Sequence, residues 1–122
     1  MKQVELDVLG KEDPFELIGQ QWMLITAGDK DSFNTMTASW GGLGWLWNKP
    51  VAFIFVRPER YTHDFLESSD KVTLSFFPES CRKLLKTDMK PTEFLDKEIP
   101  DKWYSSAGLH SVYVLEIESL WM

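Results

Sequence analysis

The sequence predicts a mainly β domain, a small β-barrel with short helices, and three observations support this. Five or six short runs, apolar or alternating, have the length and residue types of strands, and turn clusters separate them. The helical signals are few and brief, which disfavours an alternating βαβ array. The chain of 122 residues, 43% of them hydrophobic, fits a single domain over 1–122 with a globular core.

The first half of the chain predicts a short helix followed by a hairpin. Asp13 can cap the helix and Gly19 can end it. The apolar run 22–27 is typical of a strand. Turn residues at 28–32 then lead into a second strand over 33–40, which we expect to be its hairpin partner.

The second half predicts one more helix and the remaining strands. In order, the expected elements are a buried strand over 51–56, a helix over 60–67, and strands over 71–77 and 111–120. Tyr61 and Phe65 share one side of that helix at i,i+4 spacing. The polar span 79–106 is the least decisive part, with one or two helical turns expected over 91–96.

Composition and charge disfavour several classes of function. A net charge of −6 disfavours nucleic acid, whose phosphates need a basic surface. Cys81 is the only cysteine, so an internal disulfide and a multi-cysteine zinc site are excluded. Residues 1–10 lack the apolar core of a signal peptide, and no apolar run is long enough to span a membrane. We therefore expect a cytoplasmic protein that binds neither nucleic acid nor membrane.

The segment 34–50 holds the most informative residues. Period two places the hydroxyls of Thr35, Thr37 and Ser39 on one face of the predicted strand. A glycine-rich bend is expected next, where backbone can approach a ligand closely, and three tryptophans crowd around it. These residues are Gly41, Gly42, Gly44, Trp40, Trp45 and Trp47. The pattern suits a ligand with a polyol or phosphate tail and an aromatic head, and the alternative is an exposed hydroxyl face beside a turn.

Basic groups gather at the start of the second predicted helix. Arg57 and Arg60 flank a proline there, and a helix N-terminus together with the planar fork of arginine favours a phosphate. Thr62, in the first turn, can add its hydroxyl. The alternative is a surface arginine pair that meets nearby acids. His63 is expected at the surface, whereas His110 can either donate to a ligand or serve as a structural histidine.

Motifs of self-sufficient catalysis are missing from the sequence. Hydrolase signatures, a P-loop and a dinucleotide-binding fingerprint are all absent, and the two histidines lack metal-ligand spacing. Nothing in the sequence directs a base at the Cys81 thiol. If the protein is an enzyme, its demanding chemistry therefore belongs to a bound cofactor and not to a metal.

Four motifs closely resemble the flavin reductase-like, flavoredoxin-type family. They are L-I-T-A-G-D (24–29), N-T-M-T-A-S-W-G-G-L-G (34–44), L-W-N-K-P-V-A (46–52) and F-V-R-P-E-R-Y-T (55–62). The match runs from about Pro14 to Phe77. It resumes at F-L-D-K-E-I-P-D-K-W-Y (94–104) and H-S-V-Y-V-L-E-I-E (110–118).

This resemblance implies an FMN-binding split β-barrel, usually a homodimer, in which NAD(P)H reduces FMN and the flavin passes electrons to an acceptor. The segment 34–40 would lie along the flavin and its ribityl chain, and 57–62 near the phosphate. The implied flavin contacts are Asn34, Thr35, Met36, Thr37, Ala38, Ser39 and Trp40. The implied phosphate-side contacts are Arg57, Arg60, Tyr61 and Thr62. His110 is a further candidate, near the flavin or nicotinamide ring.

Two other functions stay open at this point. One is a non-enzymatic flavin-binding or electron-carrier module that works with a redox partner protein. The other is a degenerate barrel with a structural or partner-binding role.

The chain departs from the family between Phe77 and Cys81. Relatives carry a few tens of additional residues there, including a phosphate-contacting loop and a further strand. We therefore expect a barrel with an open edge after Phe77 and a reduced or lost affinity for flavin. Either a second chain or a rearranged segment 81–86 would close that edge.

Overall fold

The computed structural model describes residues 1–77, 83–90 and 110–122. Cys81 and the helical turns expected over 91–96 lie outside these residues. The elements, in chain order, are β1 (Gln3–Val4), η1 (Leu6–Lys11), η2 (Phe15–Gln20), β2 (Met23–Gly28), β3 (Phe33–Ala38), β4 (Gly42–Leu46), β5 (Lys49–Val56), α1 (Tyr61–Glu67), β6 (Lys71–Phe76), β7 (Lys83–Lys90) and β8 (Ser111–Trp121).

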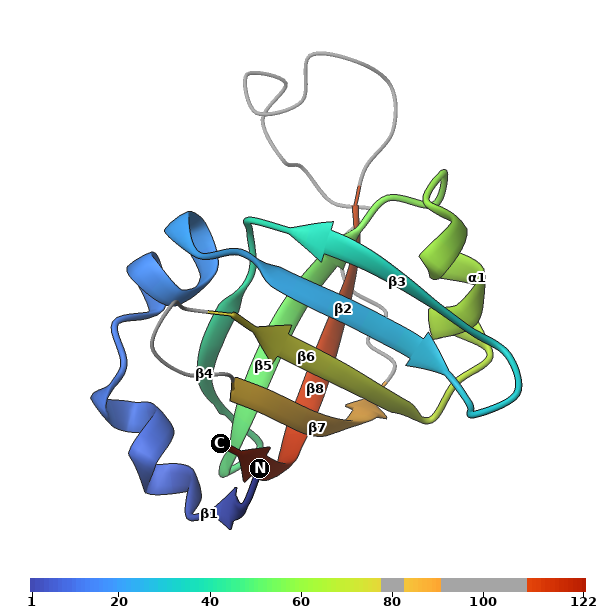
Figure 1. Ribbon diagram of the computed structural model, residues 1–122. Coiled ribbons are helices and arrows are strands. Elements are labelled where there is room, and N and C mark those ends of the chain that lie inside the picture. The colour runs from blue at the N-terminus through green and yellow to red at the C-terminus, as the bar shows by residue number, and fades with distance from the viewer. Residues whose placement is uncertain (78–82, 91–109) are drawn as a thin grey trace, which may run out of the picture.

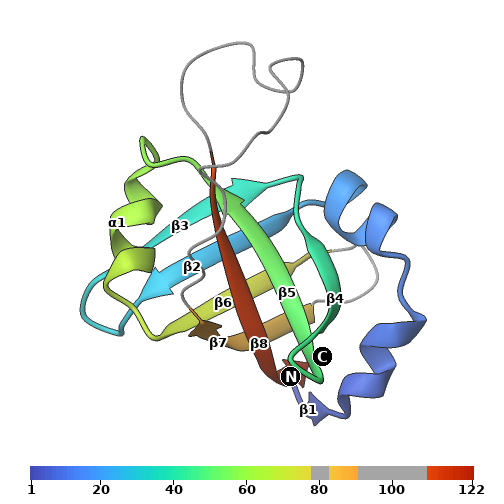
Figure 2. The ribbon, with the colours of Figure 1, turned by 180° about the vertical axis from the view of Figure 1, so that it is seen from behind.

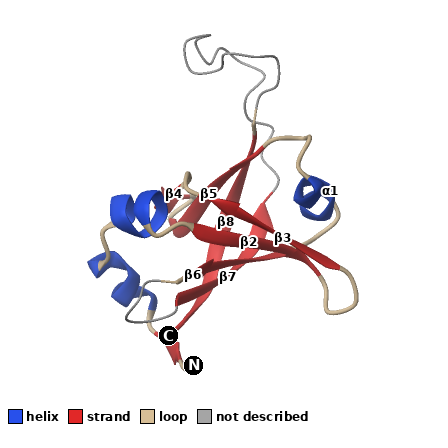
Figure 3. Ribbon diagram, turned by 45° about the horizontal axis from the view of Figure 1, so that its top comes forward, coloured by secondary structure: helices blue, strands red, loops and turns tan. Residues whose placement is uncertain are grey.

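The eight described strands form one antiparallel sheet. Their order is β3-β2-β6-β7-β8-β5-β4, and β1 pairs with the end of β8. The sheet curls on itself, so that β2, β3, β6 and β7 cross in front of β5 and β8 in Figure 1 and behind them in Figure 2. Figure 3 shows these two layers with α1 on one flank. The prediction of a mainly β barrel with short helices is confirmed.

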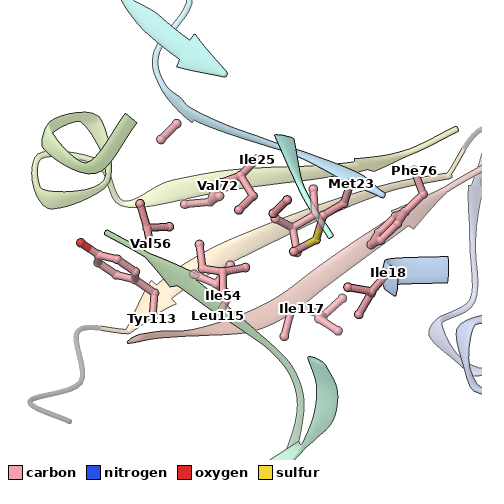
Figure 4. Close-up of a cluster of buried hydrophobic side chains, with 14 of the residues drawn as sticks. Ile18, Met23, Ile25, Ile54, Val56, Val72, Phe76, Tyr113, Leu115 and Ile117 are labelled. Carbon is pink, nitrogen blue, oxygen red and sulfur yellow. The ribbon is translucent and has the colours of Figure 1, made fainter. Parts of the chain in front are cut away.

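The core lies between the two layers of the curled sheet. Alternation is strict in β2 and β6, where every second side chain is buried. Figure 4 shows Ile25 of β2, Ile54 of β5, Phe76 of β6 and Leu115 of β8 converging on one cluster. Each of these four side chains is fully buried, which stabilises the fold by roughly 1.5–3 kcal/mol apiece.

The predicted hairpin is present as β2 and β3. Asp29 organises its turn, because Asp29 Oδ1 accepts hydrogen bonds from the N–H groups of Asp31 (2.8 Å) and Ser32 (2.9 Å). The bonds from Ser32 and Asp31 also lower the pKa of the Asp29 carboxyl. Gly28 has φ +116°, and a Cβ there would lie 2.3 Å from the carbonyl oxygen of Ser32, so this turn requires glycine.

The first predicted helix is present as η2 but extends further than expected. Asp13 Oδ1 accepts from the N–H of Phe15 at 2.9 Å, as its capping role predicts. The prediction that Gly19 ends the helix is wrong. A bond from the N–H of Gln21 to the carbonyl of Glu16, at 2.9 Å, carries the last turn past the glycine.

The expected glycine-rich bend is a strand, β4. Its ladder with β5 runs up to the pair Leu46–Lys49, which encloses a two-residue turn. That turn has φ +52° at Trp47 and +58° at Asn48, the left-handed conformation that a type I′ hairpin requires. The prediction was wrong because glycine is a poor strand former locally, and here the pairing with β5 overrides that tendency.

β7 lies where the sequence predicted an open edge. It pairs antiparallel with β6, from Lys71–Asp88 to Phe76–Lys83, and with β8 on its other side. The edge expected to be open after Phe77 is therefore closed from within the chain, the second of the two alternatives that the sequence left, by residues that begin at Lys83. Antiparallel neighbours need only a short connection, so the strand that follows Cys81 can close the sheet from within the chain.

Candidate functional site

The predicted site residues come from four elements that meet on one side of the barrel. These are β3, the end of β5, α1 and the start of β8 (Figure 1). β3 is the last strand in the sheet order, so one of its backbone edges pairs with no other strand among residues 1–77, 83–90 and 110–122. We call this the open edge of β3. Such an edge offers backbone N–H and C=O groups to a ligand.

Asn34 and Thr62 join β3 to α1. The Thr62 hydroxyl donates to Asn34 Oδ1 at 2.6 Å, and Thr62 is only 1% exposed. The hydroxyl therefore lies inside the contact between helix and strand, and its proton is already committed. This bond fixes where α1 begins relative to the open edge of β3.

Trp40 connects the end of the hydroxyl segment to β5 and β8. Its indole Nε1–H donates to the carbonyl oxygen of Phe55 at 2.6 Å. Its ring lies 6.1 Å from the ring of His110, centroid to centroid, at an interplanar angle of 57°. Trp40 remains 37% exposed, so part of the ring is open to a ligand.

The charge state of His110 depends on its surroundings. Its partial burial and then the positive charge of Arg57 lower the pKa of the imidazole, while Glu59 acts in the opposite direction. His110 is therefore neutral at pH 7, and the guanidinium of Arg57 is the cation that acts on it.

The hydroxyl row of β3 faces outward. Thr35, Thr37 and Ser39 are exposed, whereas the Met36 and Ala38 side chains between them are buried in the core. Met36 and Ala38 could thus contact a ligand only through their backbone. Thr35 Oγ1 lies 2.9 Å from Thr26 Oγ1 on β2, so one hydroxyl of the row already has an internal partner.

The remaining phosphate-side candidates lie at the start of α1. Arg60 is the exposed residue before the helix, and its carbonyl accepts from the N–H of His63 at 2.9 Å. Tyr61 is 69% exposed and meets Phe65 edge-on, with ring centroids 5.3 Å apart. Both candidates can reach a ligand from the surface.

Two features of this region differ from what the sequence suggested. His63 is not a surface residue, since its side chain is only 14% exposed and its Nε2 lies 3.0 Å from Ser111 Oγ. The glycines of β4 do not offer open backbone, because a Cβ on Gly44 would lie 3.0 Å from the ring of Phe53. Only the pairing of distant segments reveals these contacts, so the local pattern could not have predicted them.

The described residues contain neither a metal-binding cluster nor a membrane-spanning helix. No group of three or more His, Cys, Asp or Glu side chains gathers there in a way that would hold a metal ion. In the same residues, every helix is too short or too polar to cross a bilayer.

Comparison with known proteins identifies the class of fold. The sequence matches no protein-family model and no curated protein. The FMN-binding domain of a flavin reductase-like enzyme from Shewanella baltica has a TM-score of 0.63 at 14% identity, over 98% of this chain and 75% of that one. A pyridoxamine 5′-phosphate oxidase-like protein from Lactobacillus delbrueckii has a TM-score of 0.62 at 16% identity, over 100% of both chains. The NADH:FAD oxidoreductase SgcE6 from Streptomyces globisporus has a TM-score of 0.57 at 12% identity, over 99% and 86%.

These structures share the FMN-binding split β-barrel, and this chain has the same fold. The fold class predicted from the sequence is confirmed. At identities of 12–16% the likeness extends to the fold and not to a particular reaction.

Proposed function

We propose that this protein binds FMN and acts as an oxidoreductase of the flavin reductase type, moving electrons from NAD(P)H through FMN to an acceptor. One observation carries the proposal: Trp40, Arg57, Thr62 and His110, from four separate segments, gather beside the open edge of β3. The flavin-related names of the solved structures with this fold support it further.

The residues present fit such a ligand. The exposed hydroxyls of Thr37 and Ser39 suit a polyol chain, and the guanidinium groups of Arg57 and Arg60 suit a phosphate. The partly exposed ring of Trp40 suits a flat aromatic head. When bound, FMN supplies the capacity to accept a hydride and pass electrons on.

The contribution of the chain itself is to bind, orient and shield that ring. Trp40 is fixed by its bond to the Phe55 carbonyl, so its ring is held in place before a ligand arrives. His110, neutral at pH 7, would act as a hydrogen-bonding partner and not as a fixed positive charge.

We further propose that the protein is a homodimer. Phe15, Trp22, Trp45 and Trp47 are each at least 50% exposed, which is costly for a monomer in water. Size-exclusion chromatography with light scattering measures the mass directly, and a monomeric mass at micromolar concentration would count against this proposal.

One observation favours a second candidate, a degenerate barrel with a structural role. The hydroxyls of Thr62 and Thr35 already bond to Asn34 and Thr26, which reduces what they can give to a ligand. An electron carrier that binds flavin without oxidising NAD(P)H is the third possibility from the sequence.

A visible spectrum followed by an FMN titration separates these functions. The proposal predicts flavin absorption in the purified protein or after titration, thermal stabilisation by FMN, and FMN-dependent oxidation of NADH or NADPH. Flavin binding without turnover supports the carrier, whereas neither binding nor stabilisation supports the degenerate barrel. Trp40→Leu should weaken FMN binding about tenfold, and the matched variant Trp45→Leu on β4 should leave it unchanged.

A further inference from the structure

A polar cluster lies between α1 and β8, apart from the residues that the proposed function uses. His63 and Glu67 come from α1, one helical turn apart, and Ser111 and Tyr113 come from one face of β8. His63 Nε2 lies 3.0 Å from Ser111 Oγ and 3.7 Å from Glu67 Oε1. The Tyr113 hydroxyl donates to the same Glu67 oxygen. We call this cluster the α1–β8 network.

Tyr113 belongs to both the core and this network. The residue is only 5% exposed, and Figure 4 shows its ring beside Val56 with the hydroxyl directed to the side where α1 lies. Its ring also meets that of His63 edge-on, with centroids 6.1 Å apart. Burial and the bond to Glu67 raise the pKa of the phenol, so the hydroxyl stays a donor throughout the ordinary pH range.

The network has a particular place in the chain. His63 directly follows Thr62, whose hydroxyl ties α1 to β3, and Ser111 directly follows His110, which meets Trp40. α1 spans only seven residues, and a helix of that length is not stable without tertiary contacts. The first residues of α1 form one end of the proposed site, and the first residues of β8 form the other end. The bonds between α1 and β8 therefore hold these two ends together.

We propose that the α1–β8 network is a positioning device, which fixes Arg60–Thr62 relative to His110 and so sets the preference of the site for a phosphorylated flavin. Its effect on ligand choice rests on the proposed function, whereas its effect on the position of α1 does not. The network residues are positioning residues, since they act through α1 and have no ligand contact of their own.

Two measurements on the full chain test this. In the ligand-free protein, hydrogen exchange of the α1 amides should become about tenfold faster in Tyr113→Phe and Glu67→Ala, because each variant removes a bond that involves a charged group. In Glu67→Gln, where an amide oxygen can still accept from Tyr113, exchange should return to within about twofold of the wild type. A bond lost from the native state also lowers the free energy of global unfolding, so β2 is followed by its amide chemical shifts, which report the structure of the barrel and should not change in any of these variants.

The second measurement compares affinity for FMN with affinity for riboflavin, which lacks the phosphate. Tyr113→Phe and Glu67→Ala should weaken FMN binding about fivefold and riboflavin binding less than about twofold, because only the phosphate end is displaced. Glu118→Ala is the matched control. Like Glu67, Glu118 is an exposed glutamate with a polar partner, but it lies on β8 and pairs with Lys71 Nζ at 2.6 Å. Glu118→Ala should change neither the ratio of FMN affinity to riboflavin affinity nor the hydrogen exchange of the α1 amides.

Several results would overturn the inference. Unchanged α1 exchange in both Tyr113→Phe and Glu67→Ala would do so, as would chemical-shift changes in β2 as large as those in α1, or failure of Glu67→Gln to restore protection. An unchanged FMN-to-riboflavin ratio in a wild type that binds FMN would also overturn it. If the wild type binds neither flavin, the proposed function fails, and hydrogen exchange alone decides whether the network positions α1.

Discussion

The two end strands of the sheet, β3 and β4, meet solvent in different ways. β3 alternates buried Met36 and Ala38 with exposed hydroxyl side chains and is tied to α1 through Asn34. On β4, two of the five residues are glycines, Gly42 and Gly44, which have no side chains to present. Those glycines lie against the ring of Phe53 on β5.

This difference shows that the hydroxyls and the glycines have separate roles, although they are adjacent in the sequence. On β3 the outward side chains are available to a ligand, and Trp40 marks where that surface stops. On β4 the missing side chain of Gly44 makes room for Phe53, so this glycine serves packing and not ligand approach. Substitutions on and between the two strands test that separation.

The largest effect is expected at Gly41, where the chain passes from one end strand to the other. Its φ is +139°, and a Cβ would lie 2.9 Å from the Phe53 carbonyl oxygen. Gly41→Ala should therefore lower the free energy of unfolding by about 2–4 kcal/mol, as measured by urea denaturation. Gly42→Ala is the control, because its Cβ would meet Phe53 at an ordinary 3.8 Å and the change should stay within about 0.5 kcal/mol. Equal losses in both variants would contradict the packing account.

A smaller loss is expected when the tie between β3 and α1 is cut. Thr62→Val removes the donor to Asn34 Oδ1 and leaves that oxygen partly buried without it, so the free energy of unfolding should fall by about 1–2 kcal/mol. Thr37→Val makes the same chemical change on the exposed face of β3. Its free energy of unfolding should stay within about 0.5 kcal/mol of that of the wild type. Thermal melts of the two variants compare them directly, and coincident curves would rule out a stabilising bond.

The hydroxyl row should affect binding more than stability. In the double variant Thr37→Ala/Ser39→Ala we expect FMN affinity to fall about tenfold, since the proposed function assigns one hydrogen bond to the ligand to each of these hydroxyls. Its free energy of unfolding should fall by less than about 1 kcal/mol, because both side chains are exposed. Isothermal titration calorimetry measures the affinity. An unchanged value would mean that the hydroxyl row is an ordinary solvent-exposed face and does not bind FMN.

The smallest effect concerns the titration of His110, followed through its ring proton by NMR. Burial and Arg57 lower the pKa of His110, so Arg57→Gln should raise it, and Glu59→Gln should lower it further. The value in Arg57→Gln should remain below the ordinary one, because burial is the larger cause. Since the folded state holds the neutral imidazole more strongly, this group contributes stability above the unfolded pKa that is lost as pH falls through the folded one. A downward shift in Arg57→Gln would contradict the charge argument.

Most of the fold could be predicted from local patterns, and the exceptions share a cause. Alternation in β6 and the turn residues around Asp29 are local signals, and both predictions are confirmed. β4 and β7 were missed because their residues, glycines in one and a lysine-rich mixture in the other, are poor strand formers by themselves. Pairing with neighbouring strands makes them strands, and that information is not local.

The candidate site shows the same limit. Asn34, Thr62, Trp40 and His110 were all named from the sequence, but the bond between the first two joins segments that meet only in the folded barrel. His63 was assigned to the surface because a single helix cannot reveal that β8 packs against it. Whether the named residues contact a flavin stays a prediction.

The place of β8 in the sheet has a consequence for how the chain is made. β8 contains the last described strand residues, yet it joins the ladder β3-β2-β6-β7 to the ladder β5-β4. Until the ribosome has released Ser111–Trp121, these ladders have no strand between them in the part of the chain that the structure describes. The sheet therefore cannot be completed before β8 is available, and we expect a nascent chain stalled before Ser111 to expose the edges of β7 and β5 that β8 covers to chaperones or to aggregation.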